Sequence, residues 1–557
     1  MQDRPSDKEI HIPALIVGGG IVGLSASLFL SHQGISSLLI ERHAGTSIHP
    51  RARGINSRTM ELYRELGIDD AVRAAGAELA DTFGFHQGQS LREVIESRPR
   101  KPDGEKKLPG GGMLAKISPS TAARGTQDKI EPVLLQAARE RGGDLRFFTE
   151  LRTFEQDDTG VTATVRERKS GAEYTVHADY MIAADGANSR TRSILGATTS
   201  GRGSLGHLLN VLFQADLREL VRGRKFSLCI IDRPEVRGLF TSINNSDRWV
   251  FHISYDYAKG ERAEDYPLER CEKLLRLALG MPEIKLEIKS ILPWESAMRV
   301  VDNFQHGHVF FAGDAAHQMP PWGGQGANTG IADAHNLAWK LAAVLKRQAG
   351  PTLLNTYDVE RRPVGYLAAD ESAAAADARG LLSKSKMTAL LPMIRRAPRL
   401  LGYGYEYASK AVISDGTTAR GIVWQLLSGK LGLDGRPGTR APHAWIEYEG
   451  KRISTLDLFG KGFVLLTGTD GNAWYQAAPL VAQRLGIDLC AYRINPAGDL
   501  RDPDDHWRNK AGISTQGALL VRPDGFVAWR SRQQHSHPRQ ELERTITHIL
   551  SRDTIYV

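Results

Sequence analysis

Cysteine is scarce in this chain of 557 residues. The three cysteines, Cys229, Cys271 and Cys490, are far apart and odd in number. They provide neither a disulfide framework nor the Cys-x-x-Cys pair of a thiol redox site. The first nine residues are polar and of mixed charge, unlike the apolar stretch of a secretory signal. These absences favour a reducing compartment, and we expect the protein to be cytoplasmic.

Long hydrophobic runs are also missing. No apolar stretch is long enough to cross a bilayer, so no membrane association is expected. The net charge is +8, but the lysines and arginines are dispersed and not interleaved with aromatic residues, so we expect no nucleic-acid partner. We also expect no metal site. The length predicts about three or four domains.

A glycine-rich turn follows the first apolar segment. Residues 14–17 read ALIV, typical of a buried parallel strand, and Gly18, Gly20 and Gly23 follow in a G-x-G-x-x-G pattern. A helix that ends near Gly34 and a second strand that ends at Glu41 complete a βαβ unit. Such a turn presents helix N–H groups to a pyrophosphate, and the acidic residue accepts hydrogen bonds from a ribose. The unit predicts FAD or NAD binding.

A second match to the same pattern, from Gly201 to Gly206, has no apolar strand before it and no acidic strand end after it. We interpret this second match as a loop, because the glycine pattern alone is weak evidence.

Two further motifs follow predicted strands. Residues 180–184 lead into Asp185-Gly186, and residues 309–312 lead into Gly313-Asp314. An isolated Asp-Gly or Gly-Asp pair is usually an ordinary turn. In this order and context, the two pairs and the glycine-rich turn resemble the motifs of the class A flavoprotein aromatic hydroxylases, the family of p-hydroxybenzoate hydroxylase and phenol hydroxylase.

The resemblance covers nearly the whole chain and is strongest to the larger members, which act on phenols, hydroxyphenylpropionate and aromatic polyketides. It implies a bound FAD, a small aromatic substrate, O2 and a transiently docked NAD(P)H, with NADPH favoured. Asp314 would hold a ribityl hydroxyl of the FAD, and Gln127 would open a flavin-contacting helix. The implied cofactor-binding residues are Gly18, Gly20, Gly23, Glu41, Arg42, Arg51, Arg124, Gln127, Asp185, Gly186, Gly313, Asp314, Pro321, Gly324, Gly326, Ala327 and Asn328.

A loop rich in glycine and proline, residues 319–328, precedes an apolar-striped helix and looks like the family's isoalloxazine loop. A helix N-terminus there stabilises negative charge on a reduced flavin. Pro321, Gly324 and Arg53 are the implied catalytic residues. Arg51 and Arg53 belong to the segment HPRARG (residues 49–54), which would lie along the flavin phosphates or near a mobile ring. A surface ion pair explains each such arginine equally well.

The expected fold class is α/β, with four parts. A Rossmann-like FAD-binding domain comprises residues 1–85, 112–200 and 295–360, and an inserted antiparallel substrate sheet comprises 86–111 and 201–294. A helical connection (361–435) leads to a thioredoxin-like domain (436–557) without a Cys-x-x-Cys pair, for which a structural or dimerising role is the better interpretation. Residues 97–112 are expected to form a mobile loop. For the oligomeric state, the sequence is compatible with both a monomer and a homodimer.

By the same resemblance, NAD(P)H reduces the FAD, O2 adds at flavin C4a, and the resulting hydroperoxide hydroxylates an electron-rich ring carbon. Candidate bases for the substrate are His252, Tyr255, Tyr257 and His317, although each is also explained as a structural residue. Two alternatives are an FAD-dependent oxidase or dehydrogenase without oxygen insertion, and a non-catalytic FAD-bound scaffold. A flavin-dependent halogenase is disfavoured because the chain lacks that family's Trp-x-Trp segment.

Overall fold

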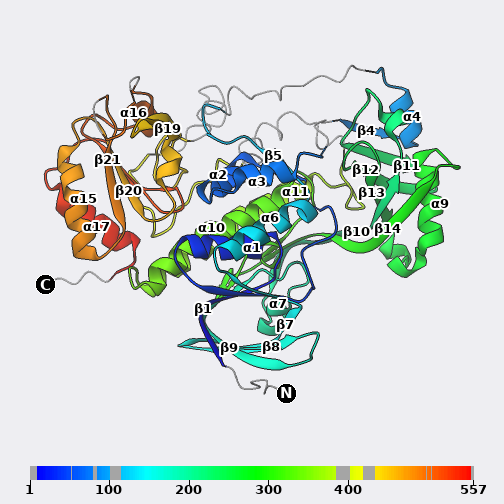
Figure 1. The fold of residues 1–557 in the computed structure, drawn as a ribbon, viewed down its shortest axis with the longest axis horizontal. Helices are drawn as coiled ribbons and strands as arrows, with labels where there is room; N and C mark the ends of the chain where they lie inside the picture. Colours follow the sequence, from blue (N-terminus) through cyan, green and yellow to red (C-terminus); the bar gives the residue numbers. More distant parts are fainter. Residues whose placement is uncertain are drawn as a thin grey trace.

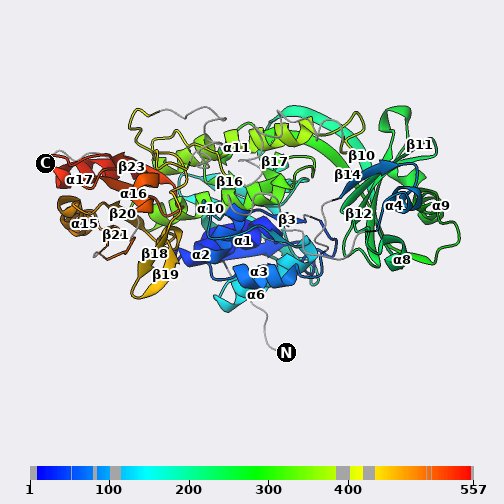
Figure 2. The same ribbon diagram turned by 90° about the horizontal axis from the view of Figure 1, so that it is seen from above.

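A computed structural model describes residues 9–51, 53–79, 84–100, 115–383, 402–417, 433–496, 499–502 and 505–552. These residues form three lobes in a row (Figures 1 and 2). A central lobe carries the N-terminal glycine turn, and it is flanked by a sheet lobe and a C-terminal lobe. No helix in the described ranges combines the length and the apolar character that a membrane span needs.

The central lobe is built on a mostly parallel sheet with the order β15-β16-β9-β1-β2-β6, to which the hairpin β7–β8 is joined through β9. Residues 14–17 are buried in β1, as the apolar run predicts. The strands are β1 (Ile10–Val17), β2 (Ser37–Glu41), β6 (Asp144–Phe147), β7 (Thr149–Asp157), β8 (Gly160–Glu167), β9 (Glu173–Ala183), β15 (Gln305–His306) and β16 (Val309–Phe311), with a separate pair β3 (Gly54–Ile55) and β5 (Ala123–Arg124).

Helices of the central lobe bury the sheet, with α1 packed against both α6 and α10. The helices are α1 (Ile21–His32), α2 (Ser57–Glu65), α3 (Asp69–Ala75), α6 (Gln127–Glu140), α7 (Arg190–Leu195), α10 (Gln325–Leu345) and α11 (Asn355–Ala374), with 3-10 turns η3 (Gly313–Ala315) and η4 (Pro351–Leu354). Because β16, β9, β1 and β2 run parallel, the three motifs that follow β1, β9 and β16 meet at one edge.

The sheet lobe is a seven-stranded sheet with the order β17-β14-β10-β13-β12-β11-β4. One face is covered by α4, α8 and α9, and the other, here called the inner face, is turned toward the central lobe. The elements are β4 (Phe85–Gly88), β10 (Thr199–Ala215), β11 (Leu228–Arg233), β12 (Val236–Ser242), β13 (Arg248–Tyr255), β14 (Leu286–Val301), β17 (His317–Gln318), α4 (Leu91–Glu96), α8 (Arg218–Val221), α9 (Leu268–Leu279), η1 (Tyr257–Lys259) and η2 (Ala263–Asp265).

The second glycine match corrects a prediction, because residues 201–206 are not a loop. They lie within β10, which pairs with β14 through two register shifts in this stretch. A Cβ on Gly201 would lie 2.4 Å from the Met298 carbonyl oxygen, and a Cβ on Gly206 would lie 2.1 Å from that of Arg379. These glycines allow a bulged strand to pass close to neighbouring backbone.

The C-terminal lobe contains a four-stranded sheet with the order β21-β20-β22-β23. Helix α15 joins the parallel strands β20 and β21, and α17 follows the antiparallel pair β22–β23, which is the order of elements expected of a thioredoxin-like domain. Cys490 is exposed on β21, far in the fold from Cys229 and Cys271, which are buried in the sheet lobe. The elements are β18 (Trp445–Tyr448), β19 (Lys451–Ser454), β20 (Phe463–Thr467), β21 (Leu489–Arg493), β22 (Ala518–Val521), β23 (Val527–Ser531), α15 (Asn472–Leu485), α16 (His506–Ala511), α17 (Pro538–Ile549) and η5 (Thr455–Leu458).

Two predicted segments fall partly outside the described residues. The expected loop at residues 97–112 overlaps the omitted range 101–114, and the expected helical connection overlaps the omitted ranges 384–401 and 418–432. Within the connection, α11 is the described helix.

A buried cluster of charges joins the central and C-terminal lobes. Arg522 of the C-terminal lobe donates to both carboxylate oxygens of Glu360 on α11, at 2.6 and 2.9 Å. Lys340 on α10 donates to the same carboxylate at 2.8 Å, and Arg522 also pairs with Asp524. All four side chains are at most 1% exposed. Each buried charge is therefore compensated by an opposite charge and by hydrogen bonds.

We predict that Glu360→Gln destabilises the protein by about 3–5 kcal/mol, because Lys340 and Arg522 would lose their shared buried carboxylate. Thermal unfolding measures this as a large fall in melting temperature. Glu219→Gln is the matched control, since Glu219 pairs with Arg222 on the surface and is 74% exposed, where such a pair contributes little. Equal melting temperatures for the two variants would refute the role of the buried cluster.

Candidate active site

The glycine turn after β1 is held by close backbone approaches. Gly18 has a φ of +112°, and a Cβ there would lie 2.3 Å from the Ala184 carbonyl oxygen at the end of β9. A Cβ on Gly23 would lie 1.9 Å from the Gly18 carbonyl oxygen. At Gly20, the N-cap of α1, the nearest atom to a Cβ is 3.6 Å away. Gly18 and Gly23 are thus required by the fold, whereas Gly20 leaves open the space in front of the helix N-terminus.

Glu41 lies at the end of β2 beside this turn, as predicted. Its carboxylate accepts a hydrogen bond from the Gly19 N–H at 2.6 Å and from the His43 N–H at 2.8 Å. The carboxylate therefore braces the turn, and the ribose-binding role implied for it stays a prediction.

Glu131 is a buried acid at the α1 N-terminus that sequence reasoning did not single out. It lies one helical turn after Gln127, which opens α6 as predicted and donates to Glu131 at 2.5 Å. Glu131 also accepts from the Ser47 N–H at 2.7 Å and is 1% exposed. Burial raises the pKa of its carboxyl group. The i, i+4 spacing from Gln127 was the signal available in the sequence.

The Asp-Gly motif lies beside the glycine turn, at the end of β9. Asp185 accepts hydrogen bonds from the Ser189 hydroxyl at 2.6 Å and from the Thr191 N–H at 2.9 Å, so its carboxylate shapes the start of α7. Gly186 has a φ of +80°. Arg192, a further residue that sequence reasoning missed, joins this loop to the Gly-Asp motif by donating to the carbonyl oxygens of Ala187 and Ala315.

Asp314 follows β16 and lies in the 3-10 turn η3. Its side chain is accessible to solvent, yet the surrounding protein raises the pKa of its carboxyl group by burial. A Cβ on Gly326 would lie 3.7 Å from Asp314 Oδ1, so the first turn of α10 lies next to this carboxylate. A solvent-accessible carboxylate beside a helix N-terminus fits a polar, multiply hydroxylated group such as a ribityl chain.

The loop before α10 is fixed by its own hydrogen bonds. Gly324 is the N-cap of α10 with a φ of +65°, and its N–H donates to the Pro321 carbonyl oxygen at 3.1 Å. Asn328 accepts from the Asn56 N–H and donates to the carbonyl oxygens of Gly54 and Gly324. Its side chain thus clamps the loop to β3, and direct cofactor contact by Asn328 and Ala327 stays a prediction.

The four arginines that were predicted as cofactor-binding or catalytic residues lie in different parts of the fold. Arg42 is exposed, whereas Arg51 lies near Asp314, since its charge lowers the pKa of that carboxyl group against the effect of burial. Arg53 donates to the backbone carbonyls of Ser227 and Ser242 in the sheet lobe. Burial and the neighbouring Arg124 lower the pKa of Arg53 to about 10. Arg53 and Arg124 therefore lie where the central lobe meets the inner face of the sheet.

The four candidate bases differ in their surroundings. His252 is on the inner face, where burial and the nearby His49 and Arg53 lower its pKa to about 3. Burial raises the pKa of Tyr255, and Tyr257 is 47% exposed. His317 is fully buried and donates to Asp333 at 2.7 Å. A neutral, weakly basic His252 is a hydrogen-bonding group rather than an effective proton acceptor.

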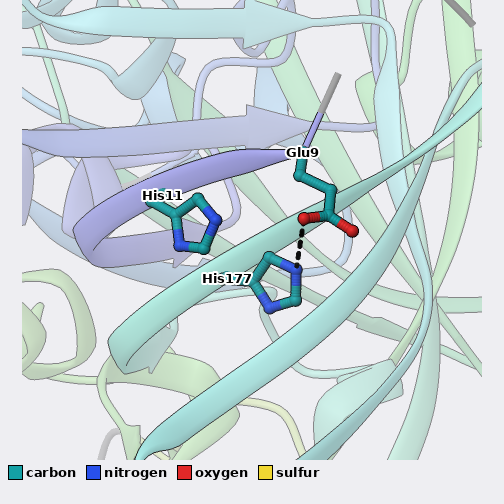
Figure 3. Close-up of side chains that lie close together, drawn as sticks. All are labelled: Glu9, His11 and His177. Carbon is teal, nitrogen blue, oxygen red and sulfur yellow. Dashed lines mark ion pairs between the residues drawn. The ribbon is translucent and has the colours of Figure 1, made fainter. Parts of the chain in front are cut away.

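A separate group of possible metal ligands, Glu9, His11 and His177, lies near the start of β1 (Figure 3). The imidazole rings of His11 and His177 stack with centroids 4.7 Å apart, and His177 Nε2 is 3.9 Å from Glu9 Oε2. His11 and His177 face each other across β1 and β9 at the amino-terminal parts of these strands. The motif loops follow the carboxyl ends of the same strands, so this group lies apart from the candidate active site.

Comparisons with known proteins define the class of this molecule. Residues 11–372 match the family described as FAD binding domain, and residues 434–552 match the family described as aromatic-ring hydroxylase, C-terminal. The chain belongs to the FAD-dependent aromatic-ring hydroxylases, and it is an FAD-dependent monooxygenase. The family and the α/β fold class predicted from the sequence are confirmed.

Individual relatives cover almost the full chain. The tetracenomycin A2 monooxygenase-dioxygenase of Streptomyces glaucescens is 39% identical, over 97% of both chains. The 4-methyl-5-nitrocatechol 5-monooxygenase of a Burkholderia species is 36% identical, over 98% of both chains. A crystal structure of aklavinone-11 hydroxylase with FAD and aklavinone is 37% identical with a TM-score of 0.83, and covers 99% of this chain and 100% of that one.

We predict that Gly20→Ala preserves the apoprotein but weakens FAD binding. A methyl group there meets only an ordinary contact with Glu131, yet it fills the space before the α1 N-terminus. Such overpacking costs about 1–3 kcal/mol, or roughly 5- to 100-fold in affinity. Apoprotein melting and FAD titration by flavin fluorescence measure the two effects. Gly23→Ala is the contrasting variant, since its methyl group would collide with the Gly18 carbonyl and lower the melting temperature itself. The interpretation fails if Gly20→Ala binds FAD like the wild type.

We predict that Asp314→Ala weakens FAD binding by up to ~100-fold, because a ribityl hydroxyl would lose a charged acceptor worth about 1–3 kcal/mol. Equilibrium dialysis of the apoprotein with FAD measures the change. Asp158→Ala is the control, since Asp158 is exposed in the turn between β7 and β8. An unchanged FAD affinity in Asp314→Ala would remove the role assigned to this carboxylate.

Proposed function

We propose that this monooxygenase hydroxylates a phenolic or polycyclic aromatic substrate, with an aromatic polyketide as the favoured type. In the balanced reaction, NAD(P)H and a proton supply two electrons and two hydrogens. One atom of O2 enters a ring C–H bond as a hydroxyl group, and the other leaves as water. NADPH is favoured as the reductant. Two of the relatives above are named for polycyclic compounds and one for a nitrocatechol, so the proposal includes both polycyclic and single-ring aromatic substrates.

The observation that carries the proposal is the position of residues 320–328. Trp322 of this loop belongs to the same buried hydrophobic cluster as Leu208, Ile230 and Leu239 on the inner face of the sheet. The same loop leads into the α10 turn beside Asp314. A flavin held at Asp314 would therefore face an apolar sheet surface, which is the lining expected of a site for an aromatic compound.

The bound FAD supplies hydride acceptance and oxygen transfer. The chain supplies the electrostatics and the shape: the unpaired N–H groups at the start of α10 stabilise negative charge, and Arg51 adds positive charge nearby. The inner face and the loop exclude water from the ring being hydroxylated. We assign Pro321 and Gly324 to the shape of the loop, and Arg53 to the boundary between the FAD and substrate regions.

Further parts of the proposal concern organisation. We propose the sequence-based division into an FAD-binding domain (1–85, 112–200 and 295–360), a substrate sheet (86–111 and 201–294), a helical connection (361–435) and a C-terminal domain (436–557). We also propose a cytoplasmic location and a monomer or homodimer. The C-terminal domain is proposed to be structural, supported by the buried contacts of Arg522 with Glu360.

We predict that substrate binding accelerates flavin reduction, because the ring must reach a transiently docked NAD(P)H. Stopped-flow absorbance would follow flavin bleaching with NADH and with NADPH, each with and without a panel of phenols and polycyclic hydroxyaromatics. Products would then be analysed under labelled O2. We expect some ligand to accelerate bleaching and one labelled oxygen atom to appear in its product.

Two outcomes would contradict this function. Fast bleaching without any ligand would remove the substrate dependence of reduction. Oxidation of a ligand with hydrogen peroxide as the only oxygen product would favour an oxidase or dehydrogenase. A protein that consumes no NAD(P)H with any ligand would instead favour the non-catalytic scaffold.

A further inference from the structure

The inner face of the substrate sheet carries a hydrogen-bonded network of side chains between two apolar patches. Leu208, Ile230 and Leu239 share a buried hydrophobic cluster with Trp322 at one end, and Val250 shares one with Leu79 at the other. Between these two apolar patches lie Asn210 on β10, His252 on β13 and Thr241 on β12. They share a face, because Asn210 is the register partner of His252, which is in turn the register partner of Leu239.

The hydrogen bonds around the imidazole agree with a neutral ring, and the orientation of the Asn210 amide decides which ring nitrogen carries the proton. His252 Nδ1 contacts Asn210 Oδ1, and His252 Nε2 is 3.2 Å from Thr241 Oγ1. An amide oxygen only accepts, so with this oxygen facing the ring Nδ1 carries the proton, Nε2 is an acceptor, and Thr241 donates to it. Burial and the nearby His49 and Arg53 lower the pKa of His252 to about 3, which agrees with a neutral ring.

The two ends of the network retain hydrogen-bonding capacity. Asn210 keeps its amide N–H groups as donors, and the Thr241 oxygen keeps its lone pairs as acceptors. If the Asn210 amide is rotated by 180°, the direction of both hydrogen bonds to His252 reverses. The two ends, Asn210 and Thr241, then still offer one acceptor and one donor. The imidazole ring separates the two ends, so they address two different oxygen substituents rather than one.

We propose that Asn210 and Thr241 recognise two oxygen substituents on one edge of a fused-ring substrate, and that His252 is a positioning residue that holds both. The inference rests on the proposed function. It narrows the substrate class to polyoxygenated fused aromatics, and it assigns His252 to orientation instead of proton abstraction. A second imidazole, His49, is 3% exposed, and neither of its ring nitrogens has a hydrogen-bond partner among the described residues. Because His49 lies close enough to His252 to lower its pKa, the central lobe also presents a polar group near this part of the sheet.

The test compares ligands that differ only in oxygen substituents. The FAD-loaded enzyme is titrated with 1,8-dihydroxyanthraquinone, 1-hydroxyanthraquinone and anthraquinone, and binding is followed by perturbation of the flavin spectrum. We expect wild type to prefer the dihydroxy compound. Thr241→Val and Asn210→Leu should each weaken binding of that compound by about 3- to 10-fold and leave anthraquinone unchanged. His252→Phe should remove the preference, and His252→Gln should restore part of it.

Thr162→Val is the matched control, since Thr162 makes a Thr–His bond of similar length, 3.1 Å, to His177 outside the sheet lobe. Melting temperatures separate loss of recognition from loss of folding. Equal losses for all three ligands, or full retention of the preference in the variants, would overturn the inference while leaving the monooxygenase intact. If wild type binds and hydroxylates no hydroxyaromatic at all, the proposed function fails and takes this inference with it.

Discussion

The shared carboxylate of Glu360 is the interaction on which the arrangement of the lobes depends. It accepts hydrogen bonds from Lys340 of α10 and Arg522 of the C-terminal lobe, and the Ser409 hydroxyl donates to it as well. Removing either charged partner, Lys340 or Arg522, would leave the buried cluster with a net charge, which is far more costly than losing a surface pair. The position of α10 is therefore determined by both lobes at once.

A second series of buried contacts connects the C-terminal lobe to the cofactor motifs. Asp333 of α10 accepts hydrogen bonds from the Gly313 N–H at 3.2 Å and from Arg361 at 2.8 Å. Arg361 in turn donates to the Tyr407 hydroxyl at 2.9 Å, and the Tyr407 ring stacks on Phe526 of the C-terminal lobe. The residue before Asp314 is thus connected through buried contacts to a lobe that contributes no residue to the predicted cofactor set. This connection gives the C-terminal lobe a physical role without thiol chemistry.

The position of the sheet lobe depends on a different feature, the length and bending of two of its strands. Strands β10 and β14 are long enough to join the sheet lobe to the central lobe, and the glycines at 201–206 let β10 bend beside β14. The inner face therefore meets Trp322 of the loop before α10, and the polar residues of this face lie among apolar ones. In the proposed substrate site, a few hydrogen bonds would orient the ligand, while the apolar surface would supply most of the contact.

The sequence by itself determined the central lobe, because local patterns specify it. Apolar runs followed by glycines predicted β1, β9 and β16, and parallel pairing then required Gly18, Asp185 and Asp314 to lie at one edge. The resemblance correctly implied the FAD-dependent class. Residues 201–206 were misread, because a bulge depends on the neighbouring strand and leaves no local signal.

Tertiary structure alone decided the remaining features. Ser47 beside Glu131, Ala315 beside Arg192 and Arg522 beside Glu360 are partners far away in the sequence, so no spacing rule connects these pairs. The protonation state of His252 could not be predicted from the sequence for the same reason. Its neutral form follows from burial and from contacts with Asn210 and Thr241 on other strands. Local sequence specifies elements and their ends, whereas buried charge and proton positions depend on which elements pack together.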